Sequence, residues 1–158
     1  MRPCGIHATV SWVFQLLVAT ILLQTLYFKF TGAPESRFIF TQMGIEPWGR
    51  IGTGIVELIA SGMILHRRLA FLGGLLAAGL MAGAIGSHLT VLGIAVQNDG
   101  GLLFTLAVTA FGGAAIVVWL RRAQGLRALA AWGFLGEATL PSEPQCAFCA
   151  EPHETEKT

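Results

Sequence analysis

The stretch LAFLGGLLAAGLMAGAIGSHLTVLGIAV, residues 69–96, contains no Asp, Glu, Lys or Arg, and a second uncharged stretch runs from Leu102 to Leu120. At about 1.5 Å per residue, a helix of either length can cross the roughly 30 Å hydrocarbon core of a bilayer. Charged residues make up only 12% of the whole chain, about half the share that is usual in soluble domains. The sequence therefore predicts an integral membrane protein, and it excludes an ordinary soluble enzyme, a disordered chain and a disulfide-rich miniprotein.

Two further apolar segments complete the predicted membrane domain. Helices are the expected form, because unpaired backbone groups are prohibitive in lipid and a closed barrel needs many alternating strands. Short connections make consecutive spans antiparallel neighbours. We expect an all-α, four-transmembrane-helix bundle over residues 1–124, with spans at about 9–29, 48–66, 69–96 and 101–120.

The segments around these spans have other characters. The first span carries Gln15 and Gln24 and is followed by no small-x-small cleavage site, so we interpret it as a retained helix rather than a signal peptide. The loop from residue 30 to 50 is expected at the membrane surface. Residues 125–140 suggest an interfacial segment, and residues 141–158 form a polar tail that contains cysteine.

The basic residues of the connections predict the orientation. Cytoplasmic connections of membrane proteins carry an excess of Lys and Arg. One side of the predicted bundle holds more of them than the other: Arg2, Arg67, Arg68, Arg121, Arg122 and Arg127 against Lys29, Arg37 and Arg50. We therefore expect both termini in the cytoplasm. The formal net charge is only +1, so no basic footprint indicates a nucleic acid partner.

Small residues crowd the third predicted span. Gly79 and Gly83 form a small-xxx-small pair, which allows two helices to approach closely in lipid. A tightly packed bundle core is the simpler interpretation. The alternative is that the missing side-chain volume leaves room for a flat ligand.

Polar side chains gather in one predicted layer of the bundle. Glu57 and His88 lie about 10 Å and about 12 Å below the outer surface at the rise of a helix, and Gln24 lies at a similar depth. Ionisable residues within a span are expensive and indicate a functional site. Glu57 is either protonated and neutral or ionised and paired with His88 or Lys29. The candidate ligand-binding or proton-handling residues are Gln24, Tyr27, Lys29, Glu57 and His88, and a purely structural role stays open.

The cysteines lie near the termini. Cys146 and Cys149 have the C-x-x-C spacing that allows two thiolates to chelate one metal. A zinc or iron site is one hypothesis, built from Cys4, His7, Cys146 and Cys149 with His153 as a substitute ligand. An unliganded tail and a redox dithiol are the alternatives.

Three motifs, in this order, resemble those of the DoxX-like integral membrane proteins. YFKFTG at 27–32 resembles the K-x-x-G end of that family's first helix, GTGIVEL at 52–58 its G-x-x-E-L second helix, and MAGAIGSHL at 81–89 its G-A-x-x-x-H third helix. The resemblance implies a four-helix bundle in the bacterial cytoplasmic (inner) membrane. It also implies an association with quinone-linked sulfur oxidation and with membrane oxidoreductase assemblies.

Two functions follow as hypotheses. The first is an accessory subunit of a larger, redox-linked membrane complex, which we favour because the predicted spans contain no cysteine and no paired histidines for a redox cofactor. The second is a quinone- or small-molecule-binding redox subunit, in which Glu57 and His88 exchange protons in a pocket of the outer half. A small transporter is disfavoured, because no inverted repeat is visible.

Overall fold

A computed structural model describes residues 5–131 of the chain, with side chains from 7 to 127, and every element in that range is a helix. The element order is α1 (Gly5–Thr31), α2 (Pro34–Gln42), α3 (Trp48–Leu65), α4 (Ala70–Ser87), a π-helical turn η1 (His88–Leu92) and α5 (Leu102–Ala131). The predicted all-α class is confirmed for this part of the chain.

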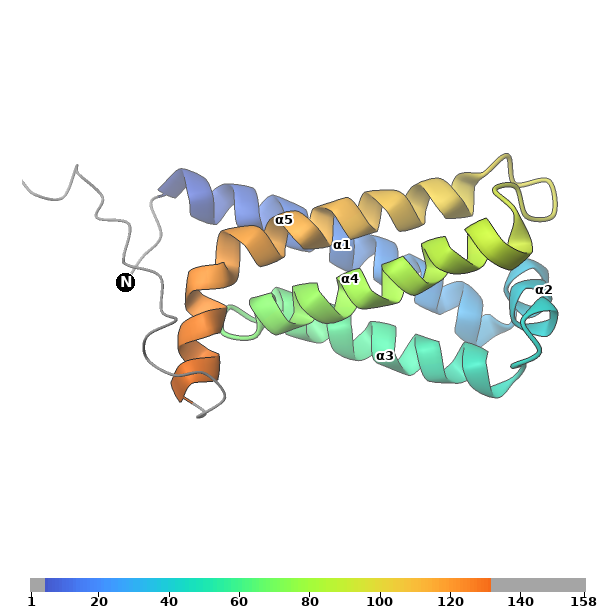
Figure 1. The fold of residues 1–158 in the computed structure, drawn as a ribbon, viewed down its shortest axis with the longest axis horizontal. Helices are drawn as coiled ribbons and strands as arrows, with labels where there is room; N and C mark the ends of the chain where they lie inside the picture. The colour runs from blue at the N-terminus through green and yellow to red at the C-terminus, as the bar shows by residue number, and fades with distance from the viewer. Residues whose placement is uncertain (1–4, 132–158) are drawn as a thin grey trace, which may run out of the picture.

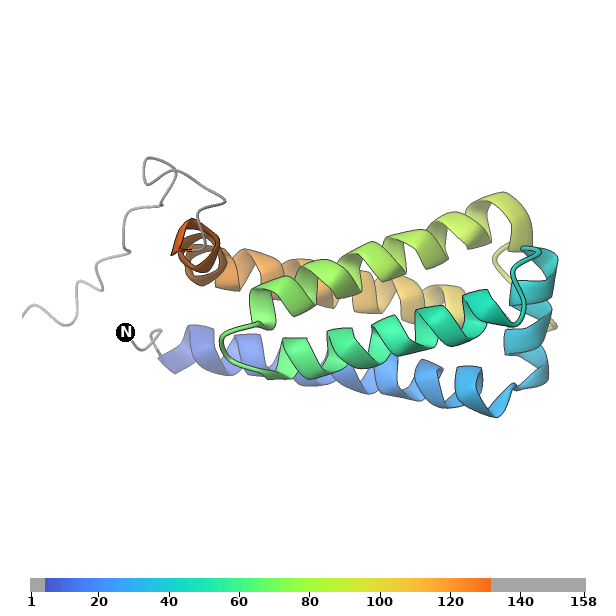
Figure 2. The ribbon, with the colours of Figure 1, turned by 90° about the horizontal axis from the view of Figure 1, so that it is seen from below.

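The long helices α1, α3, α4 and α5 run alongside one another as a bundle (Figure 1). Helix α1 packs against α3 and α5, and α4 packs against the same two helices, so α1 and α4 are diagonal partners. The short helix α2 crosses one end of the bundle (Figure 2). The start of α1, the α3–α4 turn and the end of α5 all lie at the opposite end (Figure 1).

Three of these helices are long and apolar enough to cross a membrane: His7–Thr31 of α1, Ala70–Leu92 of α4 with η1, and Leu102–Arg127 of α5. Their outward faces are apolar, as in Leu16 and Leu89, which are more than half exposed. A soluble protein rarely exposes apolar faces of this extent, so these helices indicate a lipid environment. Helix α3 is not among the three, and it carries Arg50 and Glu57.

Two helices differ in extent from the predicted membrane spans. The helix that was expected to run to Val96 ends at Leu92, because Gly93 adopts a positive φ of 77° that ends the helix. Helix α5 does not end at Leu120 but continues to Ala131, and its last part bends across the end of the bundle (Figure 1). The expected breaker turn is present, with Gln97 and Asn98 at positive φ.

The loop between the first two long helices contains α2, which the sequence analysis did not single out. Pro34 occupies the first turn of α2 and Glu35 lies beside it. Proline is pre-organised for a first helical turn, and an acidic side chain is favourable near a helix N-terminus. Gly32, with a φ of 67°, makes the reversal between α1 and α2.

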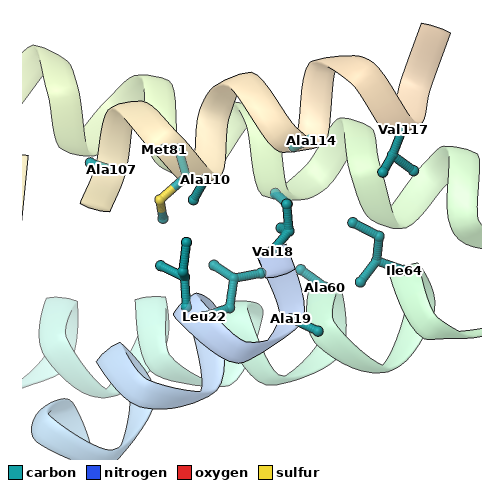
Figure 3. Close-up of a cluster of buried hydrophobic side chains, with 12 residues drawn as sticks. Val18, Ala19, Leu22, Ala60, Ile64, Met81, Ala107, Ala110, Ala114 and Val117 are labelled. Carbon is teal, nitrogen blue, oxygen red and sulfur yellow. The ribbon is translucent and has the colours of Figure 1, made fainter. Parts of the chain in front are cut away.

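The core lies along the bundle axis, where small and branched side chains of all four long helices meet (Figure 3). Val18, Leu22, Ile64 and Val117 are fully buried there. Between α3 and α4 the approach is very close: a Cβ at Gly73 would lie 2.7 Å from the carbonyl carbon of Met63. This tight contact is at the end with the α3–α4 turn.

Candidate functional site

A cavity of about 1180 Å³ lies among the helices and extends from the α2 end to Met63 and Leu72, near the α3–α4 turn. Binding cavities for small molecules are commonly about 300–1,000 Å³, mostly apolar, with a few placed polar groups. Leu75, Leu76, Leu80 and Leu106 are typical of the walls here. Polar side chains are concentrated among the residues nearest α2: Gln24, Thr25, Lys29, Glu35, Ser36, Thr53, Glu57, Ser87, His88 and Asp99. The cavity is therefore amphipathic.

Lys29 and Glu57 form an ion pair in the cavity wall. The Lys29 Nζ atom lies 2.7 Å from Glu57 Oε1 and 2.9 Å from Oε2, and only 3% of the Glu57 side chain is exposed. Thr25 Oγ1 lies 2.9 Å from the Leu22 carbonyl oxygen and 3.4 Å from Glu57 Oε2. An ammonium group has three N–H donors, so one donor of Lys29 remains beyond the two that Glu57 accepts.

The C-terminal end of α1 is tied to α3 a second time. The Arg50 guanidinium donates to the carbonyl oxygen of Lys29 and to Glu46, whose Oε1 is 2.8 Å from Arg50 Nε. Arg50 is buried. A charged donor on a carbonyl oxygen of the last helical turn stabilises that end of the helix. The backbone and the side chain of Lys29 are thus both fixed by α3.

His88 opens the π-helical turn, and its ring has a defined tautomer. Its Nδ1 lies 2.9 Å from the Gly93 carbonyl oxygen, and because a carbonyl oxygen only accepts, Nδ1 carries the proton. The ring of Phe104 packs edge-on against it, with the ring centroids 5.7 Å apart. Among the described residues Nε2 has no hydrogen-bond partner, so it is the ring nitrogen left to contact a ligand at the cavity wall.

Asp99 organises the connection from η1 to α5. Its carboxylate accepts hydrogen bonds from the backbone amides of Val96, Gly101 and Leu103, at 2.8, 2.9 and 3.1 Å. Burial alone would raise the pKa of Asp99, but these three donors and the neighbouring His88 outweigh it and hold the pKa below its usual value. Asp99 therefore supplies a carboxylate close to His88.

The small residues of α4 serve two different purposes. Gly73 and Gly74 pack against α3 and α5, since a Cβ at Gly74 would lie 3.0 Å from Val118 Cγ2. Gly79 and Gly83 line the cavity, and a Cβ at either would meet nothing within 4 Å. The alternative interpretation of the Gly79–Gly83 pair, room for a ligand, agrees with this geometry better than tight packing does.

The structure brings four of the five predicted residues to one place: Gln24, Lys29, Glu57 and His88 all line the cavity. Tyr27 does not line it; its side chain is 66% exposed and packs edge-on against Phe28. Of the two partners considered for Glu57, Lys29 makes the bond. No bond joins Glu57 to His88 in the described part of the chain.

The predicted metal site falls mostly outside the described residues. Cys4, Cys146, Cys149 and His153 lie in the ranges 1–4 and 132–158. His7 is described and is exposed. Within the described range, no group of three or more metal-ligating side chains comes together, and the zinc or iron hypothesis stays a prediction.

Sequence reasoning missed two contributors to the site. Thr25 precedes Lys29 by four residues, and this spacing places both on one face of a helix. Asp99 comes just before two glycines and the start of an apolar helix, a pattern typical of a helix N-terminus. Both signals were present in the sequence.

Comparisons with known protein families, with curated proteins and with solved structures find no match for this chain. The resemblance to the DoxX-like proteins therefore rests on the three motifs alone.

Proposed function

We propose that this chain is a membrane protein that binds a lipophilic small molecule with a polar head group, and that a quinone is the ligand class that fits best. The observation that carries the proposal is the amphipathic cavity. Its polar residues are gathered near α2, and its apolar wall continues along α4 from Ala84 to Leu72. That stretch of helix is roughly 18 Å long, enough for several units of an isoprenoid tail.

The polar residues suit a head group that bears carbonyl oxygens. The third N–H of Lys29 supplies a charge-assisted donor, which makes a stronger hydrogen bond than a neutral donor does. His88 Nε2 accepts a proton, while Nδ1 stays bonded to Gly93. A bound quinone would supply two-electron redox chemistry; the residues of this chain would orient its head group and exchange protons with it.

Helix α3 completes the membrane domain as a fourth span in this proposal. Its charged side chains do not face lipid: Arg50 pairs with Glu46, and Glu57 pairs with Lys29 inside the bundle. Its exposed side chains include Ile55, Leu58 and Ile59. A span with buried, paired charges and an apolar outer face is tolerated in a bilayer.

Location and orientation follow from the charges. The end with Arg67, Arg68, Arg121 and Arg122 would face the cytoplasm, and the polar end of the cavity would lie in the outer half of a bacterial cytoplasmic membrane. The DoxX-like resemblance supports this proposal, because its three motifs supply Lys29, Glu57 and His88, which line one cavity. An accessory role in a larger redox-linked complex remains the second candidate. No contact within the described residues favours it.

The test uses the full chain, purified in mild detergent. Mass spectrometry of the extracted lipophilic molecules should find a bound quinone, and calorimetry should detect binding of decylubiquinone. Replacing Gly83, which lines the cavity, in Gly83→Leu should weaken that binding about tenfold or more by filling the site.

Gly112→Leu is the matched control. Gly112 lies on α5 and does not line the cavity, and a Cβ at this position would also meet nothing within 4 Å. Its substitution should leave the affinity within about twofold of the unaltered protein. A chain that carries no lipophile and binds no decylubiquinone contradicts the proposal; a stoichiometric protein partner in such a sample would favour the accessory role.

A further inference from the structure

The end of the bundle opposite α2 is basic and has no acidic side chain nearby among residues 7–127. Its arginines come from the α3–α4 turn and from α5: Arg67, Arg68, Arg121, Arg122 and Arg127. The acidic side chains of the same range belong to the other end, where Glu35, Glu57 and Asp99 line the cavity and Glu46 pairs with Arg50. Charge is therefore strongly segregated along the bundle.

Three of these guanidinium groups are held in place by neutral partners. Arg67 lies over the ring of Trp12, 5.9 Å from its centroid, and Arg122 lies over Trp119 at 5.4 Å. Arg121 is buried. Its Nε donates to Ser11 Oγ at 2.8 Å, and a terminal nitrogen donates to Gln124 Oε1 at 3.1 Å.

No carboxylate within residues 7–127 neutralises these three arginines. Arg67 and Arg121 contact adjacent residues of α1, Trp12 and Ser11, and like charges that are held together favour a bound anion. At the α2 end, by contrast, both Lys29 and Arg50 have a carboxylate partner. The arginine end therefore has unused capacity to bind anions.

The tryptophan rings indicate which anion is available to these arginines. Tryptophan concentrates at the boundary between hydrocarbon and head groups, and Trp119 is 60% exposed on the outer surface of α5. An arginine stacked on such a ring lies at the depth of the lipid phosphates. Guanidinium groups bind phosphate through paired N–H donors.

We propose that the arginine end, formed by Arg67, Arg121 and Arg122 with Trp12 and Trp119, binds the phosphate groups of anionic phospholipids in the leaflet that it faces. The cavity extends to Met63 and Leu72 near this end, but none of these arginines and tryptophans lines it. The proposal therefore does not depend on the nature of the cavity's ligand.

The experiment places the full chain in nanodiscs of phosphatidylcholine with or without phosphatidylglycerol. Native mass spectrometry should show that phosphatidylglycerol is retained in preference to phosphatidylcholine, and the Tm should be higher in its presence. Arg67→Gln and Arg122→Gln should each lower this retention about fivefold, the equivalent of about 1 kcal/mol for each arginine near the membrane surface. Arg37→Gln, an exposed arginine at the α2 end, is the control and should change little.

Four results would overturn the proposal. Equal retention of both lipids, or an equal loss in Arg37→Gln, would mean that no specific lipid site exists at the arginine end. A Tm rise from inorganic phosphate, at constant ionic strength and without anionic lipid, would assign the site to free phosphate. If phosphatidylglycerol is retained only after the five tail glutamates are changed to Gln, the arginine end binds the tail rather than the lipid. These glutamates are Glu137, Glu143, Glu151, Glu154 and Glu156.

Discussion

Helices α3 and α4 leave their shared turn in close contact and separate toward α2, so the two ends of the bundle have different interiors (Figure 2). Near the turn, Gly73 lies against the backbone of Met63 and Ile64. Toward α2, Gly79 and Gly83 border the cavity with open space in front of them. Glycine on α4 thus allows close helix contact near the turn and leaves open space toward α2.

The difference shows that a run of small residues in a membrane helix has no single meaning. Small residues allow close packing only where a second helix is near enough to use the space. At Gly73 that helix is α3. At Gly83 α3 has diverged, and the missing side-chain volume belongs to the cavity instead.

The largest expected effect is at the open end, in the ion pair of Lys29 and Glu57. Lys29→Met leaves the Glu57 carboxylate, 3% exposed, without its partner. Breaking a buried pair by removing one member costs about 3–5 kcal/mol, whereas replacing both members by apolar residues is often near neutral. We expect Lys29→Met to lower the Tm in detergent strongly, and the double variant Lys29→Met with Glu57→Leu to recover most of the loss.

A double-mutant cycle between Glu57 and His88 is the control for this prediction. The ring of His88 bonds to Gly93 rather than to Glu57, so the effects of Glu57→Gln and His88→Gln should add within about 0.5 kcal/mol. Strong coupling in this cycle, with none between Lys29 and Glu57, would contradict the assigned pairing.

The next effect belongs to the closed end. Gly73→Ala places a methyl group 2.7 Å from the carbonyl carbon of Met63, where backbone rather than a flexible side chain must move. Overpacking of this kind costs about 1–3 kcal/mol. Thermal unfolding in detergent should show a clearly lower Tm, and an unchanged Tm would mean that α3 and α4 are not in contact at this point.

Asp99 gives a smaller effect, which depends on pH. Its pKa in the folded chain is lowered, so its stabilising contribution is complete above the ordinary aspartate pKa of about 3.9 and is lost as the pH falls through the lower folded value. We expect Asp99→Asn to lower the Tm by a few degrees at neutral pH. The difference in Tm between Asp99→Asn and the unaltered protein should disappear only below about pH 4. A difference that disappears near neutral pH would assign the titration to another group.

The smallest effect is expected at Gly79, the open-end counterpart of Gly73. A Cβ added in Gly79→Ala meets nothing within 4 Å, and alanine is favoured over glycine in a helix by up to about 1 kcal/mol. The Tm should therefore stay the same or rise slightly. A marked loss of stability, comparable to that of Gly73→Ala, would remove the distinction between the two ends.

Much of the fold is a local property of the chain, and the sequence predicted it. The apolar run at 69–96 and the breakers at 97–101 are sufficient for two helices and a turn, because hydropathy and backbone preference act within one segment. The rise of a helix also predicted that Gln24, Glu57 and His88 lie at one depth. Helix α2 was missed, although Pro34 and Glu35 are typical of a helix start.

The partners within that layer were decided only by the tertiary structure. Depth along a helix follows from residue number, but the rotation and divergence of neighbouring helices follow from the summed packing of all of them. That packing turns Glu57 toward Lys29 and leaves Tyr27 on the outside. It also separates α3 from α4 at Gly83, which borders the cavity, while holding the two helices together at Gly73.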